Sequence, residues 1–186
     1  MTAKDYTPTS EVISLHGLGF IQVKLPANRR LHVWHPDLPR RRCFERSAIH
    51  NHRFSFRSTV LAGIQVNRRF EVMPDDDGSH DLVSHDGPRS EKGGRLSYVA
   101  GRVSLLTSLP EYSWPGSTYF MPMLAYHDTP NDDVVITMME KLDEGTVHAS
   151  SLIEHGHEFD QSFDRFQLSP DQLWDFVRDA WKRAAA

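Results

Sequence analysis

Two histidines one residue apart, His50 and His52, stand at the start of a strand-like run that ends at Gly63. Residues i and i+2 of a β-strand point to the same face, so both imidazoles can enter one cavity, about 6–7 Å apart along the chain. Neutral imidazole is a common ligand of transition metals. The pair is therefore half of a candidate metal site, and a further ligand must come from another part of the chain.

A second pair of histidines, His155 and His157, has the same spacing but a different setting. It lies in a polar stretch without strand character. The chain has eleven histidines, so pairs of this kind also arise by chance. We therefore do not expect His155 and His157 to bind a metal.

Two segments far apart in the chain carry residues at characteristic spacings. In HNHRFSFRSTVLAG, Gly63 follows His52 by eleven residues. In PMLAYHDTPN, Pro122 stands five residues before His127, and Asn131 stands four residues after that histidine. The segments resemble the two motifs of the cupin superfamily, which implies an all-β fold, an antiparallel β-barrel or jelly roll. The resemblance also implies three metal ligands: His50, His52 and His127.

The chain departs from the usual cupin motifs at two positions. Phe56 stands where many cupins have a glutamate ligand, and Leu124 stands where the second motif often has a glycine. Three neutral imidazoles without a carboxylate suit Fe(II), with open positions for a substrate and O₂. We therefore expect Fe(II) as the cofactor, although another divalent transition metal remains an alternative.

Within the cupins, the chain is similar to the thiol dioxygenases of the cysteine dioxygenase type, over about residues 30–142. The similarity lies in IHNHRFSFRSTVLAGIQ and LAYHDTPNDDVVITMMEKL. It implies a small thiol-bearing acid and O₂ as partners, with the substrate bound to iron through its thiolate and both oxygen atoms passing to sulfur. Arg57 stands where the animal enzymes have a cysteine linked to a tyrosine, so no such crosslink is expected from Cys43.

Two other classes of function remain open. A cupin can hold a redox-inactive metal that acts as a Lewis acid in an isomerase or a hydrolase. A cupin can also bind a small ligand or a partner protein without catalysis. Oxygen consumption would separate the first class from a dioxygenase, and a stoichiometric transition metal would argue against the second.

An anionic substrate would need a cation near the metal, and three arginines are candidates. Strict alternation along the strand turns Arg53 and Arg57 away from the two histidines. Arg30 leads the predicted strand RLHVWH and can reach the mouth of the cavity. Arg30 is therefore the predicted substrate-binding cation.

A tyrosine near the metal could donate a hydrogen bond to the substrate or to dioxygen. By the same alternation, Tyr119 shares a face with His127, and Tyr126 does not. Tyr119 is therefore the second predicted catalytic residue, beside Arg30.

Short β-branched and aromatic runs, separated by glycines and prolines at short intervals, predict the elements that hold these residues. Such runs are typical of a sandwich or barrel, and no strand–helix–strand alternation indicates a parallel sheet. We expect one domain over residues 1–186, with a barrel core at about 20–142. The polar segment 74–94 is predicted to be a long hairpin excursion or a mobile loop.

One α-helix is predicted, at about residues 169–184. Ser169 can cap it, Pro170 suits its first turn, and Gln172 is placed to complete a capping box. One apolar stripe then predicts that the helix packs on the outside of the barrel. The residues of this stripe are Leu173, Phe176, Val177, Ala180 and Trp181.

The composition limits the partners and the compartment. Of 186 residues, 21 are basic and 25 acidic, a net charge of −4, which gives no electrostatic footprint for nucleic acid. We expect no membrane partner, because no apolar run approaches spanning length, and the N-terminus does not resemble a signal peptide. A single cysteine makes the cytoplasm the expected location. A homodimer is an open alternative to a monomer.

Overall fold

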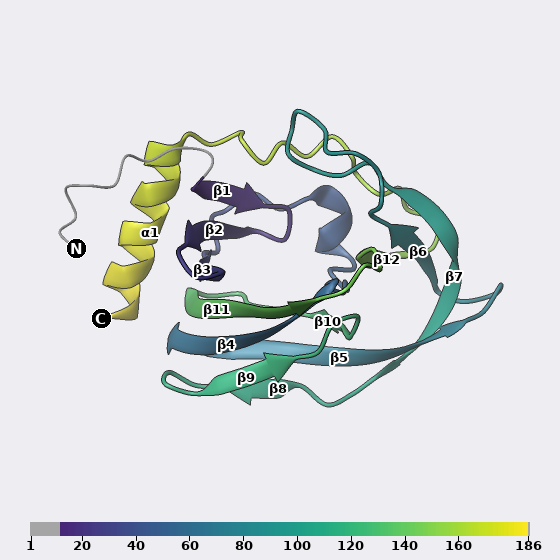
Figure 1. The fold of residues 1–186 in the computed structure, drawn as a ribbon, viewed down its shortest axis with the longest axis horizontal. Helices are drawn as coiled ribbons and strands as arrows, with labels where there is room; N and C mark the ends of the chain where they lie inside the picture. The colour runs from purple at the N-terminus through teal and green to yellow at the C-terminus, as the bar shows by residue number, and fades with distance from the viewer. Residues whose placement is uncertain (1–11, 186) are drawn as a thin grey trace.

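The computed structural model describes residues 12–185 and has two antiparallel sheets followed by one α-helix (Figure 1). The first sheet has the order β1-β2-β3-β11-β4-β9, and the second has the order β10-β5-β7-β6-β12, with β8 paired to β5. The strands are β1 (Ile13–His16), β2 (Phe20–Leu25), β3 (Arg29–Trp34), β4 (Phe54–Ala62), β5 (Gln65–Pro74), β6 (His80–Ser84), β7 (Tyr98–Thr107), β8 (Glu111–Ser113), β9 (Thr118–Met121), β10 (Tyr126–Asp128), β11 (Val135–Glu144) and β12 (Ser150–Glu154).

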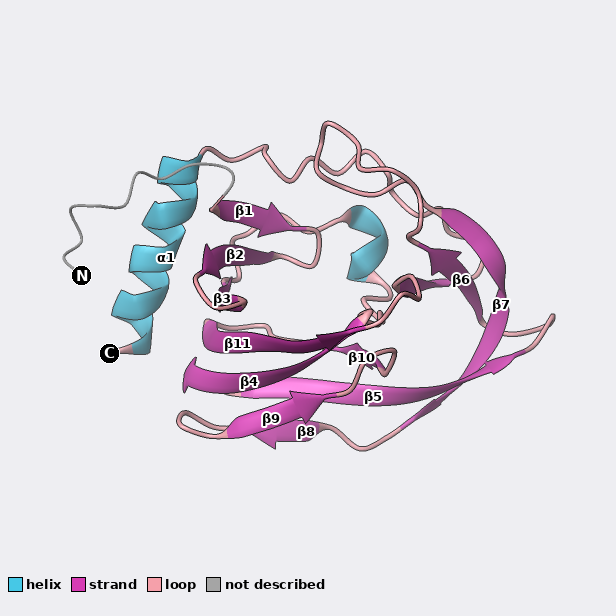
Figure 2. Cartoon of the chain, in the orientation of Figure 1, coloured by secondary structure: helices cyan, strands magenta, loops and turns pink. Residues whose placement is uncertain are grey.

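The predicted fold class is confirmed: the chain forms an antiparallel, barrel-like β fold with a C-terminal helix. Strands dominate the cartoon, and the long strands β5 and β7 curve around one side of the molecule (Figure 2). A short 3₁₀ helix, η1 (Arg42–Glu45), joins the first sheet to the segment that carries His50. All strand pairs are antiparallel, and successive residues of each strand face opposite sides of the sheet.

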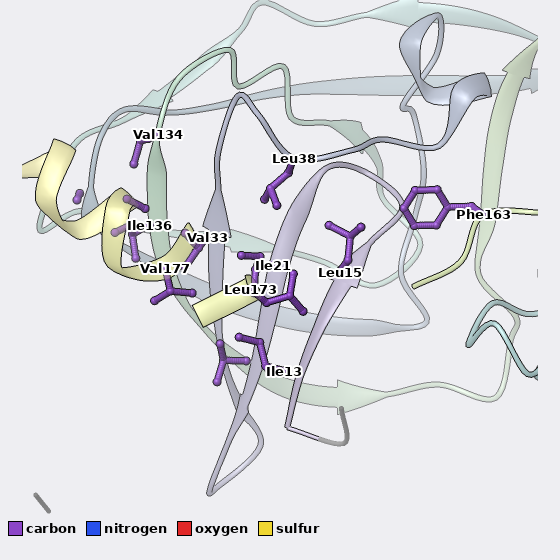
Figure 3. Close-up of a cluster of buried hydrophobic side chains, with 13 residues drawn as sticks. Ile13, Leu15, Ile21, Val33, Leu38, Val134, Ile136, Phe163, Leu173 and Val177 are labelled. Carbon is purple, nitrogen blue, oxygen red and sulfur yellow. The ribbon is translucent and has the colours of Figure 1, made fainter. Parts of the chain in front are cut away.

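The outer face of the first sheet is aliphatic and packs against the helix α1 (Pro170–Ala184). Ile13 and Leu15 of β1, Ile21 of β2 and Val33 of β3 are almost fully buried there (Figure 3). Leu173, Val177 and Ala180 of α1 complete this cluster. The prediction that the helix covers the outside of the barrel is thus confirmed.

The predicted ends of the helix are also close to those observed. The Ser169 hydroxyl accepts a hydrogen bond from the Gln172 amide at 3.3 Å, and the Gln172 side chain accepts one from the Ser169 amide at 2.9 Å. Trp181 was expected in the buried stripe but is 43% exposed, although the adjacent Ala180 is fully buried. In residues 12–185 there is no helix with the length and apolar character needed to span a lipid bilayer.

The segment 74–94 differs from the prediction. It contains the strand β6, which pairs with β7 on one side and β12 on the other. Val83 of β6 is 2% exposed and packs with Cys43 and Ile153, and Leu82 packs against the neighbouring cluster around Val103, so two apolar side chains help to hold this short strand in the sheet. The irregular excursion is residues 85–97, beyond this strand.

Candidate metal centre

The inner face of the first sheet lines a cavity of about 710 Å³. The strict alternation of β2 illustrates how the sheet serves two purposes: Ile21 packs toward the helix, whereas Phe20 and Gln22 line the cavity. The same holds for β1, in which Leu15 faces the helix and His16 faces the cavity. The second sheet and several loops close the other side.

Three histidines meet in this cavity: His50, His52 and His127. Their candidate ligand atoms all lie within 4.8 Å of one another, and their ring centroids are 4.5–5.1 Å apart. Among the described residues, no other group of three His, Cys, Asp or Glu side chains has this geometry. The fold therefore brings together the three side chains predicted as metal ligands.

The backbone that presents these histidines differs from the predicted regular strand. β4 begins only at Phe54, and His50 forms an isolated bridge with His127, in which each amide donates to the other's carbonyl oxygen at 2.9 Å. The neighbouring Asn51 amide donates to the Ser150 carbonyl oxygen, on the opposite side. Because the segment changes partners from residue to residue, it is no regular strand, yet it stays extended enough for His50 and His52 to reach one cavity.

Hydrogen bonds fix the orientation of two of the imidazoles. His50 Nδ1 lies 2.9 Å from the Ala48 carbonyl oxygen, and His127 Nδ1 lies 3.2 Å from that of Ala125. A carbonyl oxygen only accepts, so Nδ1 carries the hydrogen in both rings and Nε2 keeps its lone pair. Metal-binding histidines are commonly held in this way by a backbone carbonyl.

Burial keeps all three imidazoles neutral. It lowers the pKa of His50, and it lowers the pKa of His52 and of His127 well below the ordinary value, with the neighbouring histidines adding to both effects. Neutral imidazole is the form that binds a metal. Nitrogen ligands lie about 2.1 Å from a bound transition metal, so small side-chain rotations would bring these three onto one ion. The donor set thus fits a transition metal.

Phe56 stands at the position where many cupins have a glutamate ligand. Its ring centroid lies 5.3 Å from that of His52 and 6.4 Å from that of His127, and its side chain is buried. Met121 and Met139 pack around it. This wall of the centre is therefore apolar, and it supplies no oxygen ligand.

The two predicted catalytic residues both line the cavity. Arg30 donates from Nη1 to Gln22 Oε1 at 3.0 Å, and its guanidinium lies 5.5 Å above the Phe54 ring. Burial raises the pKa of Tyr119, so the phenol is a neutral hydrogen-bond donor. Tyr126 instead hydrogen-bonds to Ser150 at 2.6 Å and does not line the cavity.

The two arginines expected to face away behave differently. Arg57 lies outside the cavity and pairs with Glu140 at 2.9 Å. Arg53 borders the cavity, contrary to the prediction, and pairs with Glu144 at 2.7 Å. Strict alternation does not apply to Arg53, because it precedes the first residue of β4.

The second histidine pair lies elsewhere. His155 and His157 are both exposed, and His155 Nδ1 hydrogen-bonds to Asp81 Oδ1 at 2.8 Å. Neither belongs to the three-histidine group.

Sequence reasoning missed further polar residues of the cavity. His16 and His32 lie on its wall, and burial lowers the pKa of His32 to about 3 and that of His16 well below the ordinary value. His85 lies between two hydroxyls, 2.6 Å from Ser97 Oγ and 2.8 Å from Ser151 Oγ. For the first two a signal existed: each is a polar residue that alternates with aliphatic residues of a predicted strand.

The motif residue Gly63 has a clear physical role. It makes the turn between β4 and β5 with φ +74°, and a Cβ built there would lie 2.3 Å from the Val134 carbonyl oxygen. Only glycine fits both the positive φ and the close approach of the backbone. The turn fixes how β4 leaves the metal centre.

Leu124 occupies the position where cupins often have glycine, and its φ is +62°. Its amide donates to the His52 carbonyl oxygen at 2.7 Å, so this strained turn holds the backbone of a candidate ligand. A left-handed conformation costs a non-glycine residue about 1–2 kcal/mol. We therefore expect Leu124→Gly to be more stable than Leu124→Ala by about 1 kcal/mol in urea unfolding.

The neighbouring Met123, whose φ is not positive, is the matched control for Leu124. There the usual order should hold, with Met123→Ala more stable than Met123→Gly. The same order at both positions would contradict the assignment of backbone strain to Leu124.

The fold and the site define an all-β, barrel-like protein with a candidate three-histidine metal centre in its interior. Comparison of the sequence with models of known protein families finds no match, and comparison with curated proteins finds none either.

Proposed function

We propose that this protein is a metal-dependent cupin that binds Fe(II) through His50, His52 and His127. The proposed reaction is O₂-dependent oxidation of a small substrate that chelates the metal, and a thiol-bearing acid is the first class to test. The observation that carries the proposal is the convergence of three neutral imidazoles in a cavity where Phe56 replaces a carboxylate ligand.

A bound Fe(II) would supply open coordination positions and the electron-transfer chemistry that dioxygen requires. The protein's own residues would hold and orient the substrate. Arg30 would bind its anionic group, and the neutral phenol of Tyr119 would donate a hydrogen bond. Phe56, Met121 and Met139 would exclude water from this side of the site.

A redox-inactive centre is the second candidate. Three histidines are also the ligand set of catalytic zinc sites, and the apolar wall at Phe56 does not discriminate between zinc and iron. A zinc-containing protein would act as a hydrolase or an isomerase, with the metal as a Lewis acid.

Metal content and oxygen uptake, measured on the same preparation, test the proposal. We expect about one iron per chain after reconstitution under anaerobic conditions. Oxygen uptake should then depend on one member of a panel of thiols and other chelating acids. Stoichiometric zinc with no oxygen uptake on any member would favour the hydrolase or isomerase, and no bound metal would contradict both candidates.

A further inference from the structure

The cavity is strongly basic, although the whole chain has a net charge of −4. Among the described residues that line it are six arginines and two lysines, against a single carboxylate, Glu144. Glu144 already pairs with Arg53 and Lys141. The arginines that line the cavity therefore outnumber the carboxylates among the described lining residues by six to one.

Four of these arginines form what we call the arginine cluster: Arg30, Arg41, Arg89 and Arg165. In residues 12–185, none of the four forms an ion pair with a carboxylate. They lie close enough to repel one another: burial and the charges of the other three together lower the pKa of Arg165 to about 10. Arg41 is buried, Arg30 and Arg165 are half-buried, and Arg89 is exposed at the edge of the cluster. Buried charges are normally paired, so the three inner guanidinium groups lack the directly paired anion that such an arrangement requires.

The hydrogen bonds of the cluster are made with neutral groups, and the carboxylates of Asp160 and Glu144 act on Arg41 and Arg30 electrostatically without forming an ion pair. Arg165 Nε donates to the Leu15 carbonyl oxygen at 3.0 Å, and Arg89 Nη1 donates to that of Gly93 at 3.2 Å. Arg41 is only 8% exposed, and its guanidinium lies 4.3 Å from the centre of the Phe159 ring. Its Nε is buried without a hydrogen-bond partner among the described residues. These contacts orient the guanidinium groups but leave donors and charge available.

The cluster belongs to the same cavity as the three histidines. His16 connects the two regions, because its imidazole interacts electrostatically with both His50 and Arg165. The cavity volume of about 710 Å³ is in the range of sites for whole metabolites or drug-sized ligands. A ligand with one end at the histidines therefore has room for a second polar group at the arginines.

We propose that the arginine cluster binds a phosphate group of the substrate, whose other end reaches His50, His52 and His127. A phosphate ester carries about two negative charges and three acceptor oxygens, so it can bind several guanidinium groups at once. A single carboxylate carries half that charge and would leave most of the cluster unpaired. The inference extends the proposed function, since it names the substrate class of the same site as phosphorylated.

Binding of inorganic phosphate and pyrophosphate to the metal-free full chain tests this inference. By isothermal titration at constant ionic strength, we expect pyrophosphate to bind with a dissociation constant below about 1 mM. Malonate, a dicarboxylate with about the charge of inorganic phosphate, should bind at least tenfold more weakly than inorganic phosphate. Absence of pyrophosphate binding would overturn the proposal. Equal binding of malonate would show that the cluster binds dicarboxylates as well as phosphate, and would contradict a site specific for phosphate.

Variants place the binding in the cavity. Arg165→Gln and Arg89→Gln should each weaken pyrophosphate binding at least tenfold, whereas Arg57→Gln, on the exposed surface beside Glu140, should change it less than twofold. Equal weakening by Arg57→Gln would show that binding reflects general surface charge. If Arg165→Gln fails to fold by thermal unfolding, Arg89→Gln decides the result, because Arg89 lies in an exposed loop.

The measurement separates this inference from the proposed function, because it requires no metal and no turnover. Pyrophosphate binding in a protein that never takes up iron would retain the phosphate site and contradict the dioxygenase. Iron uptake with oxygen consumption on a substrate without phosphate, together with no pyrophosphate binding, would retain the dioxygenase and contradict the phosphate site.

Discussion

Replacing any one of His50, His52 or His127 with alanine is expected to remove most of the bound metal. Each variant leaves two imidazoles, and the buried wall at Phe56 provides no replacement ligand. Loss of a group that only supports a metal ligand typically costs about 10- to 100-fold in metal affinity, so loss of a ligand should cost more. Metal content after dialysis against a weak chelator measures the effect, together with the thermal unfolding temperature of each variant.

Two other histidines serve as controls for this result. His155→Ala removes an exposed imidazole, and His32→Phe replaces a buried imidazole that faces the same cavity but lies outside the three-histidine group. Both variants should keep the metal. If His155→Ala or His157→Ala lost the metal while His52→Ala kept it, the metal would be bound by the second pair of histidines and not by the predicted centre.

The convergence of the three histidines could be predicted from the sequence because its signal is local. His50 and His52 are separated by one residue, and the fixed spacings around His127 are short enough to be recognised without a structure. Their convergence depends on one antiparallel bridge between His50 and His127. No long-range detail of the fold was needed to nominate these side chains.

The arginine cluster could not be predicted in the same way. Arg30 is on β3, Arg41 and Arg89 are in separate loops, and Arg165 precedes the C-terminal helix. Nothing in their neighbouring residues distinguishes them from surface arginines. Only the closure of the sheet and its loops around one cavity shows that these charges meet.

The strands also differ in how well their own residues predict them. β2 and β4 were predicted because their β-branched and aromatic residues give a strong signal. β6, with the sequence HDLVS, has one fully buried side chain, Val83, and its polar residues resemble those of a loop. Its place in the sheet is decided by pairing with β7 and β12, which is information that the segment itself does not contain.

Replacing Phe56 with glutamate is expected to lower turnover at least 10-fold, which corresponds to about 1.4 kcal/mol in the barrier. Three neutral imidazoles leave a divalent metal with its full charge, which favours an anionic substrate. The Phe56 ring lies 5.3 Å from that of His52, so a carboxylate there can reach the metal, neutralise part of its charge and occupy a position that the substrate needs. The metal itself should be retained.

The same substitution should make stability depend on the metal. Phe56 is 6% exposed and packs with Met121 and Met139, so an unpaired carboxylate in its place would destabilise the metal-free protein by several kcal/mol. A bound metal would pair with that carboxylate and recover part of the loss. The rise in unfolding temperature on adding metal should therefore be larger for Phe56→Glu than for Phe56→Gln, because glutamine has the shape of glutamate but no charge. A Phe56→Glu protein that binds metal and turns over at the normal rate would show that the absence of a fourth protein ligand does not set the chemistry of this centre.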